Sequence, residues 1–312
     1  MRSILTAILN IIGLLSFSQS GINAAQDEKG ILVTNSGKPV FYYHIAEAVP
    51  PADSSALYRR SGFIHPLYSP AGKVLTDDFP AGHAHQHAIF MAWASTSFKG
   101  VSVDFWNQQS NKGTVKHEQL IAIKRGKNQV EIKTRLAHIS LEHGKVLDEI
   151  WTLKVYQLHK TLVIELQSDQ LNITKDTLHL KKYHYGGLAF RGSAEWNDHD
   201  KKFSNRWRLL TSEGKDTSTA NATYASWVDA SGLVENMPAG VTIFSHPSNF
   251  RHPQPLRVHP QMPYWAFSPM VEKAFFIAPG QHYKSRFLIV PHDGFADQEK
   301  SKAIFDSWLG KK

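Results

Sequence analysis

The sequence has 312 residues and no cysteine, and its 35 lysines and arginines against 27 aspartates and glutamates give a formal net charge of +8. Without cysteine the chain has no disulfides, thiolate nucleophiles or thiolate metal ligands, so any metal site must use histidine and carboxylate side chains. The positive charge favours polyanionic partners, and solubility is the alternative role for that charge.

The first 25 residues are typical of a secretory signal peptide. Arg2 precedes an apolar stretch at residues 4–17 that is too short to span a bilayer as a stable helix, and small and polar residues follow it. We expect cleavage near Ala24 or Ala25, a single β-sandwich domain at residues 26–312, a periplasmic or secreted location and no stable membrane insertion. In that compartment we expect an anionic oligosaccharide as partner and no nucleic acid.

Three histidines, His83, His85 and His87, alternate with other residues in the stretch PAGHAHQHAIFMAW. Side chains at i, i+2 and i+4 of an extended strand share one face, so this spacing predicts three imidazoles directed at one point. Such a cluster suits proton transfer or a divalent metal ion. A polar strand face, in which the histidines only bond their neighbours, is the structural alternative.

Aromatic and polar residues follow these histidines: Trp93, Asp104, Trp106 and Asn107. An indole face can cover the C–H face of a sugar ring while polar neighbours bind its hydroxyls. We therefore take these four residues as candidate substrate-binding groups. Core packing is the alternative for each tryptophan.

Residues 115–180 form several long segments in which β-branched or aromatic residues occupy every second position. Turn signals separate these segments at Lys112-Gly113, Gly126-Lys127-Asn128, His143-Gly144 and His159-Lys160. The spacing leaves no room for a crossover helix, which predicts antiparallel strands.

The C-terminal third continues the β pattern at residues 241–244, 274–277 and 283–290. Residues 298–309 are the one predicted helix, with Phe305 and Trp308 as apolar anchors. The sequence therefore predicts an all-β fold, a large antiparallel β-sandwich. A β-propeller is the alternative architecture, but the chain lacks a blade repeat.

Two further segments carry candidate chemistry. In KKYHYGGLAFRGSAEW, His184 and Tyr185 precede two glycines, and Arg191 follows them. Paired glycines permit close backbone approach or a bulge. Histidine or tyrosine can move a proton beside a carboxylate that arginine neutralises, so all three are candidate catalytic residues. A bulged strand with a buried His–Tyr hydrogen bond is the alternative.

The second segment, HPSNFRHPQPLRVH, contains His246, Asn249, Arg251 and Arg257. Its prolines predict a loop, and a loop of this composition is often a binding loop. Its arginines can each bind a carboxylate or sulfate through two hydrogen bonds. These four residues are candidate substrate-binding groups, with a solvated basic loop as the alternative.

These motifs resemble a bacterial family labelled methane oxygenase PmoA-like. The family patterns are H-P-x-Y-x-P-x-G, which residues 65–72 resemble, H-P-H-Q-H-G-I-x-x-A-W at 83–93, V-D-F-W-N at 103–107 and H-P-x-N-x-R-x-P at 246–253. The pattern H-x-Y-G-G-L-x-F-R resembles residues 184–191, in which Tyr185 follows His184 directly. The resemblance covers about residues 58–294 and departs from the family at Gly82, Ala84 and Ala88. It implies the galactose-mutarotase-like supersandwich group, in which a concave sheet binds sugars. The methane oxygenases to which the label refers are embedded in the membrane by spanning segments. This sequence shows no such segment, so the label does not indicate its function.

Together these observations predict a carbohydrate-active enzyme that acts on acidic oligosaccharides by elimination, as a lyase or dehydratase. His184 or Tyr185 moves the proton, and Arg191, Arg251 or Arg257 binds the carboxylate. No phosphate-binding loop is present, so no nucleotide cofactor is expected.

Three alternatives remain open at this stage. One is a glycoside hydrolase that uses Asp77, Asp78 or Asp104. Another is a metal-dependent enzyme whose divalent ion is held by the three alternating histidines. The third is a non-catalytic carbohydrate-binding protein, which would need the aromatic residues and arginines alone.

Overall fold

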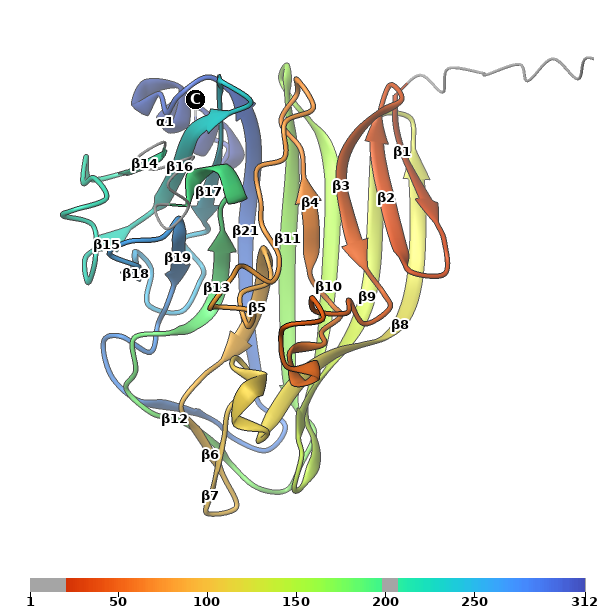
Figure 1. Cartoon of the computed structure of the whole chain (residues 1–312), viewed down its shortest axis with the longest axis vertical. Helices are drawn as coiled ribbons and strands as arrows, with labels where there is room; N and C mark the ends of the chain where they lie inside the picture. Colours follow the sequence, from red (N-terminus) through yellow and green to blue (C-terminus); the bar gives the residue numbers. More distant parts are fainter. Residues whose placement is uncertain (1–20, 198–206, 312) are drawn as a thin grey trace, which may run out of the picture.

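The computed structural model describes residues 21–197 and 207–311 of the chain. In this part, two large antiparallel sheets of nine and eight strands lie against each other, and a four-stranded sheet lies at the lower end of the molecule in Figure 1. The predicted all-β antiparallel sandwich is confirmed.

Each sheet brings together segments that lie far apart in the chain. In spatial order, the nine-stranded sheet contains β1 (Ile22–Gln26), β2 (Gly30–Asn35), β3 (Lys38–His44), β4 (Ile64–Leu67), β5 (Ile89–Trp93), β13 (Gly186–Arg191), β19 (Tyr264–Phe267), β18 (Gln254–Val258) and β15 (Tyr224–Ala225). The eight-stranded sheet contains β14 (Trp207–Thr211), β16 (Trp227–Val234), β17 (Met237–Ser245), β21 (His282–Asp293), β11 (Thr161–Asn172), β10 (Gly144–Leu158), β9 (Gln129–Ser140) and β8 (Gly113–Gly126). The small sheet contains β20 (Phe275–Ile277), β12 (Leu178–Leu180), β6 (Thr96–Phe98) and β7 (Val101–Val103).

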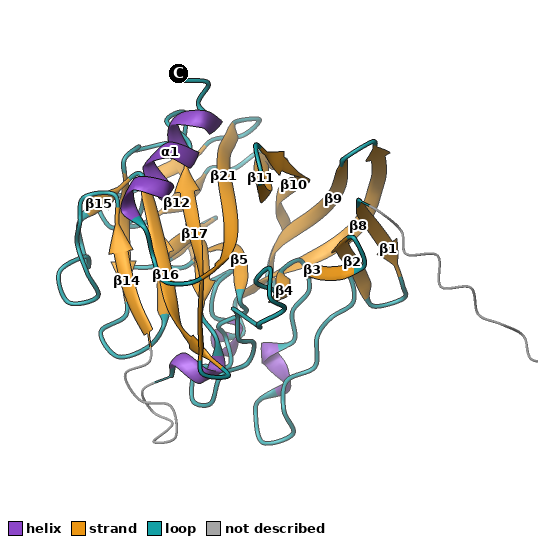
Figure 2. Ribbon diagram, turned by 90° about the horizontal axis from the view of Figure 1, so that it is seen from above, coloured by secondary structure: helices purple, strands orange, loops and turns teal. Residues whose placement is uncertain are grey.

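Four helical segments complete the described structure. Three are single 3₁₀ turns, η1 (Ala56–Tyr58), η2 (Gln108–Ser110) and η3 (Ala194–Trp196), and the fourth is the α-helix α1 (Gln298–Trp308). The α-helix matches the predicted element at residues 298–309. Figure 2 shows it against β16 and β17 of the eight-stranded sheet, where Phe305 stacks on Phe244 with 5.9 Å between ring centroids.

The long antiparallel segments predicted at residues 115–180 are confirmed by β8, β9, β10 and β11, each of which pairs with the next. In β10, buried residues alternate with more exposed ones, as expected for a strand that turns one face to the core. The predicted segments at 241–244, 274–277 and 283–290 lie on β17, β20 and β21.

The N-terminal region adds strands that the sequence patterns did not identify, β1 to β3. The expected signal peptide falls largely on residues 1–20, which lie outside the described residues. Its last residues form β1, in which Ile22 and Ala24 are buried, so the expected cleavage near Ala24 or Ala25 would cut within a paired strand. Among residues 21–197 and 207–311, no helix has the length and apolar character needed to cross a membrane.

The main hydrophobic core lies between the two large sheets. On β5, Trp93 points toward the eight-stranded sheet, and its indole Nε1 donates to Gln170 Oε1 of β11 at 2.6 Å. Phe90 has the opposite parity on β5 and contacts Trp106, with 4.8 Å between ring centroids. The nine-stranded sheet therefore has an inner face in the core and an outer face that other segments cover.

Candidate functional site

The stretch that contains the three histidines is folded into turns and is not an extended strand. Gln86 N donates to His83 O at 2.9 Å, and Gly82 has φ +75°, a left-handed conformation that glycine adopts at little cost. Of the three histidines, only His87 forms a β-bridge, to Asp78. The expected alignment of three imidazoles on one strand face is therefore wrong, because the turn rotates the rings in different directions.

His87 is fully buried and closes this loop. Its Nδ1 lies 2.8 Å from Asp78 Oδ1, and its Nε2 lies 3.4 Å from Gln108 Nε2. Burial raises the pKa of Asp78 to about 6 and lowers the pKa of His87 well below its usual value. At neutral pH a neutral His87 thus donates to an ionised Asp78, and this pair holds the loop and lies out of reach of a substrate.

His83 and His85 are half-buried at the outer surface of the loop. Their ring centroids lie 5.9 Å apart, and His83 lies 5.9 Å from His259. Burial, followed by the positive charge of neighbouring groups, lowers the pKa of His85 to about 4. Within the described ranges, no group of three or more histidine or carboxylate side chains has a metal-binding arrangement. The predicted three-histidine metal site is therefore wrong, since His87 is turned inward to Asp78.

Aromatic rings connect this loop to the segment after β12. Trp106 and Tyr264 each lie 5.5 Å from Tyr185, measured between ring centroids, and Tyr264 O accepts from His259 N at 2.8 Å. We call the resulting set the histidine–tyrosine cluster, which consists of Tyr58, His83, His85, Trp106, His184, Tyr185, Arg257, His259 and Tyr264.

His184, Tyr185 and Arg257 form the accessible part of this cluster. His184 is exposed and lies 4.8 Å from Tyr185 between ring centroids, and the Arg257 guanidinium carbon lies 5.3 Å from the Tyr185 ring centroid. The register places Phe90, Ala189, Ala266 and Arg257 in one row across β5, β13, β19 and β18. Arg257 therefore shares the outer face of the sheet with Phe90.

The two glycines after Tyr185 are required by close packing. Gly187 has φ +109°, and a Cβ atom there would lie 2.4 Å from Phe267 O. At Gly186, a Cβ atom would lie 2.1 Å from the Met270 sulfur. The expected close backbone approach is confirmed, and it fixes the position at which Tyr185 leaves the sheet.

Arg191 is fully buried and cannot contact a substrate carboxylate directly. Its Nη1 donates to Gln86 Oε1 at 3.0 Å, and its Nη2 lies 3.7 Å from Asp77 Oδ2. Burial raises the pKa of Asp77 to about 6, although the Arg191 charge acts in the opposite direction. The structure thus makes Arg191 a positioning residue for the histidine loop.

The two predicted sugar-binding tryptophans are not available to a ligand. Trp93 is 0% exposed in the core, and Trp106 is 2% exposed beneath its aromatic neighbours, so both predicted roles are wrong. Asp104 Oδ1 accepts from the backbone nitrogens of Trp106 and Asn107, both at 2.9 Å. Asn107 in turn caps η2 through Gln109 N. These two polar residues shape the turn that carries Trp106.

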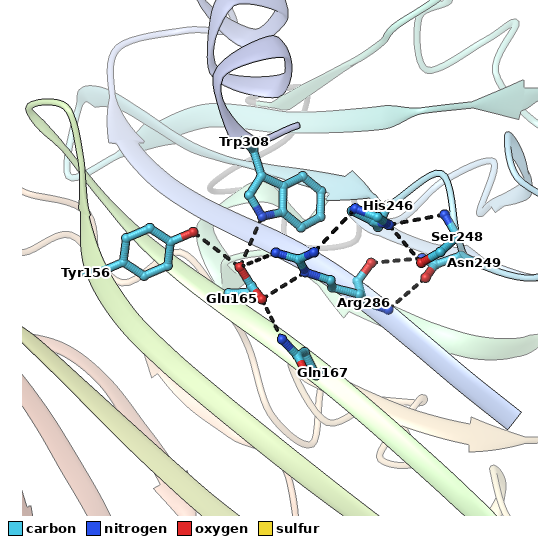
Figure 3. A network of polar contacts seen from close by, with 8 residues as sticks. All are labelled: Tyr156, Glu165, Gln167, His246, Ser248, Asn249, Arg286 and Trp308. Carbon is cyan, nitrogen blue, oxygen red and sulfur yellow. Dashed lines mark hydrogen bonds and ion pairs between the residues drawn. The ribbon is translucent and has the colours of Figure 1, made fainter. Parts of the chain in front are cut away.

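The segment 246–259 separates into two parts that serve different sheets. His246 and Asn249 lie beside β21 of the eight-stranded sheet, in the network that Figure 3 shows around Arg286. Arg286 makes two hydrogen bonds to Glu165, at 2.8 and 3.0 Å, and its Nη1 lies 3.4 Å from His246 Nε2. A cavity of about 530 Å³ adjoins this network. The structure therefore does not bring His246 and Asn249 to the histidine–tyrosine cluster.

Arg251 and Arg257 also differ in environment. Arg251 donates to the backbone carbonyls of Pro269, Lys273 and Ala274, so its guanidinium holds a loop. Arg257 lies on β18, which corrects the expectation that this whole segment is a loop. β18 tolerates its proline because it pairs on one side only with the two-residue β15 at the end of the sheet.

Sequence reasoning missed Tyr58, His259, Tyr264 and Gln86. The histidine at 259 ends the segment HPSNFRHPQPLRVH, which was a usable signal. Tyr58 and Tyr264 lie in stretches with no motif of their own. Only contacts between distant segments assign them to the cluster.

The fold and the site define an antiparallel β-sandwich with a histidine–tyrosine–arginine group on the outer face of one sheet. The family described as "Family of unknown function (DUF6807)" matches residues 30–306, so the chain belongs to that family. No curated protein matches the sequence. The resemblance to the PmoA-like family stays an expectation.

Several solved structures are similar to the chain at low identity. One is a heparan sulfate lyase HepC mutant from Pedobacter heparinus, with a TM-score of 0.41, 10% identity and coverage of 90% of this chain and 36% of that one. The GH36 alpha-galactosidase AgaB from Geobacillus stearothermophilus has a TM-score of 0.40, 11% identity and coverage of 89% and 40%. A provisional aldose 1-epimerase from Klebsiella pneumoniae has a TM-score of 0.41, 8% identity and coverage of 90% and 80%. The chain thus spans less than half of the first two proteins, and its function has to be argued from its own site.

Proposed function

We propose that the chain is an exported carbohydrate-active enzyme that cleaves or dehydrates uronic-acid-containing oligosaccharides by elimination. One observation carries the proposal: within the described residues, the Arg257 guanidinium has no carboxylate partner. Its Nη1 donates to the neutral Asn221 Oδ1 at 3.1 Å, and its planar group lies over Tyr185. A guanidinium remains charged at neutral pH, so a uronate carboxylate would supply the missing partner.

Arg257 is the best of the three candidate arginines for this role. Arg191 is buried against Gln86 and Asp77, and Arg251 is bound to backbone carbonyls. Neither can approach a substrate without breaking those contacts.

His184 would act as the general base. Burial and the nearby positive charge of Arg257 both lower the pKa of His184, so its ring is neutral near pH 7 and holds a lone pair. In the proposed step, His184 takes the proton from C5 of the uronate. Arg257 neutralises the carboxylate and stabilises the negative charge that develops at C5.

Tyr185 would act as the general acid. Burial raises its pKa, and although Arg257 opposes this shift, the phenol stays protonated at neutral pH. The electron pair of the C5–H bond forms the C4=C5 double bond, and the C4–O bond breaks with its pair on oxygen. That oxygen receives the Tyr185 proton and leaves as a sugar hydroxyl in a lyase or as water in a dehydratase.

The test is product analysis with polygalacturonate, alginate and glucuronan oligosaccharides. Elimination gives ultraviolet absorbance from the new C4=C5 bond, and the unsaturated fragment is lighter by one water than the hydrolysis product. The H184A variant is expected to lose this activity. Fragments without absorbance or the loss of water would contradict elimination, and unchanged substrate with measurable binding would favour a binding protein.

Hydrolysis is a second candidate, and the placement of the Asp77 carboxyl, largely buried but not fully closed to solvent, is the observation that favours it. Burial raises the pKa of Asp77 to about 6, a value suited to a general acid, and the side chain is 17% exposed. Saturated products that disappear in a D77N variant would support this second function over the first.

A further inference from the structure

A separate cavity of about 710 Å³ lies at one end of the sandwich, where the β2–β3 turn, the β10–β11 turn and α1 come together. This is the upper end in Figure 1 and the side toward the viewer in Figure 2. The volume lies within the range of small-molecule sites. The cavity and the histidine–tyrosine cluster share no lining residue.

A fixed imidazole lines this cavity. His292 Nε2 lies 2.7 Å from Asp229 Oδ2, which also accepts from Thr242 Oγ1 at 2.7 Å. Gly240 makes room for the ring, because a Cβ atom there would lie 2.7 Å from His292 Cε1. Since Nε2 donates to the carboxylate, a neutral His292 keeps Nδ1 as a hydrogen-bond acceptor for a ligand hydroxyl.

Two aromatic rings, Tyr68 and Phe295, line the same cavity. Phe295 is 38% exposed, unlike the tryptophans that the sequence singled out. The Arg208 guanidinium carbon lies 3.9 Å from its ring centroid, so a ligand can pack on one face of the ring only. Asp293 Oδ1 fixes the wall next to Tyr68 by accepting from Ser69 Oγ at 2.6 Å and from Ala71 N at 3.1 Å. An exposed ring beside fixed polar groups matches the two surfaces of a sugar.

The charges that line the cavity are balanced. The lining contains three lysines and three aspartates: Lys38, Lys160, Lys300, Asp229, Asp293 and Asp297. Asn35 and Gln157 add neutral hydrogen-bonding groups. A lining with balanced charges and both polar and apolar surface favours a hydroxyl-rich ligand without net charge over an anion.

We propose that this cavity binds an uncharged mono- or disaccharide. A sugar hydroxyl donates to His292 Nδ1, and the C–H face of the ring packs against Phe295 and Tyr68. This is a second binding site, beyond the proposed elimination site and independent of it.

The experiment is saturation-transfer NMR and titration calorimetry on the full chain. The probes are galactose, glucose, xylose, lactose and cellobiose, and galacturonate and glucuronate are the charged comparisons. We expect at least one neutral sugar to bind, and the H292Q and F295A variants to weaken binding about tenfold each. H282Q is the matched control, because His282 is exposed and does not line the cavity, and it should bind as the unaltered chain does.

Three results would overturn the proposal. These are no saturation transfer to any neutral sugar, tighter uronate than neutral-sugar binding that F295A weakens, or unchanged neutral-sugar binding in both H292Q and F295A. F295A keeps the test valid if H292Q fails to fold, because Phe295 is partly exposed. Elimination activity in F295A should stay unchanged, which separates this proposal from the proposed function.

Discussion

Two arginines of this molecule, Arg257 and Arg286, each lie beside an aromatic ring and a histidine, but they differ in their carboxylate partner. Arg257 lies 5.3 Å from the ring centroid of Tyr185, beside His184, and Arg286 lies 5.0 Å from the ring centroid of Trp308, beside His246. The difference is the carboxylate, because Arg286 is paired with Glu165 through two hydrogen bonds. For Arg257, no described residue supplies one.

This comparison shows that residue types alone do not identify a site. The Glu165 carboxylate also accepts from Trp308 Nε1, Tyr156 Oη and Gln167 Nε2, so every group around Arg286 is already satisfied within the protein (Figure 3). Such a network holds elements together. A guanidinium that lacks this partner and lies beside a neutral histidine and a protonated tyrosine is suited to a ligand.

The largest expected effect is on stability, in the R286A variant. Removing Arg286, whose side chain is 35% exposed, takes away its two hydrogen bonds to the 5% exposed Glu165 carboxylate. The other three donors to Glu165 remain. We expect the free energy of unfolding to fall by about 2–3 kcal/mol. Urea denaturation measures this change, and K284A on the same strand, with 69% of its side chain exposed, is the control. A loss below about 1 kcal/mol would mean that the Arg286–Glu165 pair contributes no more to stability than an exposed ion pair.

The R257A variant should show the reverse pattern. We expect the rate of elimination to fall by about 100-fold, because the substrate carboxylate loses its charged partner. The melting temperature should change little, since Arg257 is partly exposed and its side chain donates to the neutral amide of Asn221. Kinetics and thermal unfolding of R257A and R59A check this, Arg59 being an exposed arginine outside the cluster. A large stability loss with unaltered kinetics would make Arg257 structural.

The pKa of His184 gives a second test of the role of Arg257. Burial and Arg257 together hold the pKa of His184 below 6.5, so on the acid side the elimination rate should fall when the pH drops below that lowered value. Replacing Arg257 with glutamine removes a positive charge, so the imidazolium becomes easier to form and the pKa of His184 should rise. NMR titration of the ring in R257Q and in R59Q measures this. An unchanged titration in R257Q would mean that the two groups do not interact.

A smaller effect is expected in the dependence of stability on pH. Burial lowers the pKa values of His65, His85 and His117 to about 4, so between about pH 4 and 6.5 the unfolded chain binds more protons at these rings than the folded one. Stability from these rings is therefore lost as the pH falls through this window. Asp77 and Asp78, with pKa values of about 6, act in the opposite direction.

We expect the histidines to dominate, because the lowered pKa values of further rings, His87 and His184 among them, act in the same direction as those of these three. The H85N variant should flatten the loss of stability between pH 6.5 and 4, as followed by urea denaturation at several pH values. A slope identical to that of the unaltered chain would show that His85 titrates normally in the folded protein.

The fold was predictable where strands have one buried face and one exposed face. Alternation was visible in β9, β10 and β11 for this reason, and tight turns marked their ends. β5 and β13 carry no alternation because both of their faces are covered, one by the core and the other by the histidine–tyrosine cluster. The histidine stretch has a period of two in sequence but does not form a strand, because Gly82 allows a turn there.

The site was predictable only in part. His184 and Tyr185 are neighbours in sequence, so one motif contained both. The choice of Arg257 over Arg251 depended on contacts with segments more than a dozen residues away in each case. The roles of Trp93 and Trp106 depended on which face of the nine-stranded sheet each one meets, which local sequence does not encode.

The central claim is that Arg257 receives a substrate carboxylate, and a thermodynamic cycle on binding tests it most directly. The affinities of the unaltered chain and of R257A would be measured by calorimetry for a uronate oligosaccharide and for its carboxamide derivative. We predict that R257A weakens binding of the uronate by about 10- to 100-fold and leaves binding of the carboxamide nearly unchanged. Equal losses for both ligands, or no loss for either, would contradict the account.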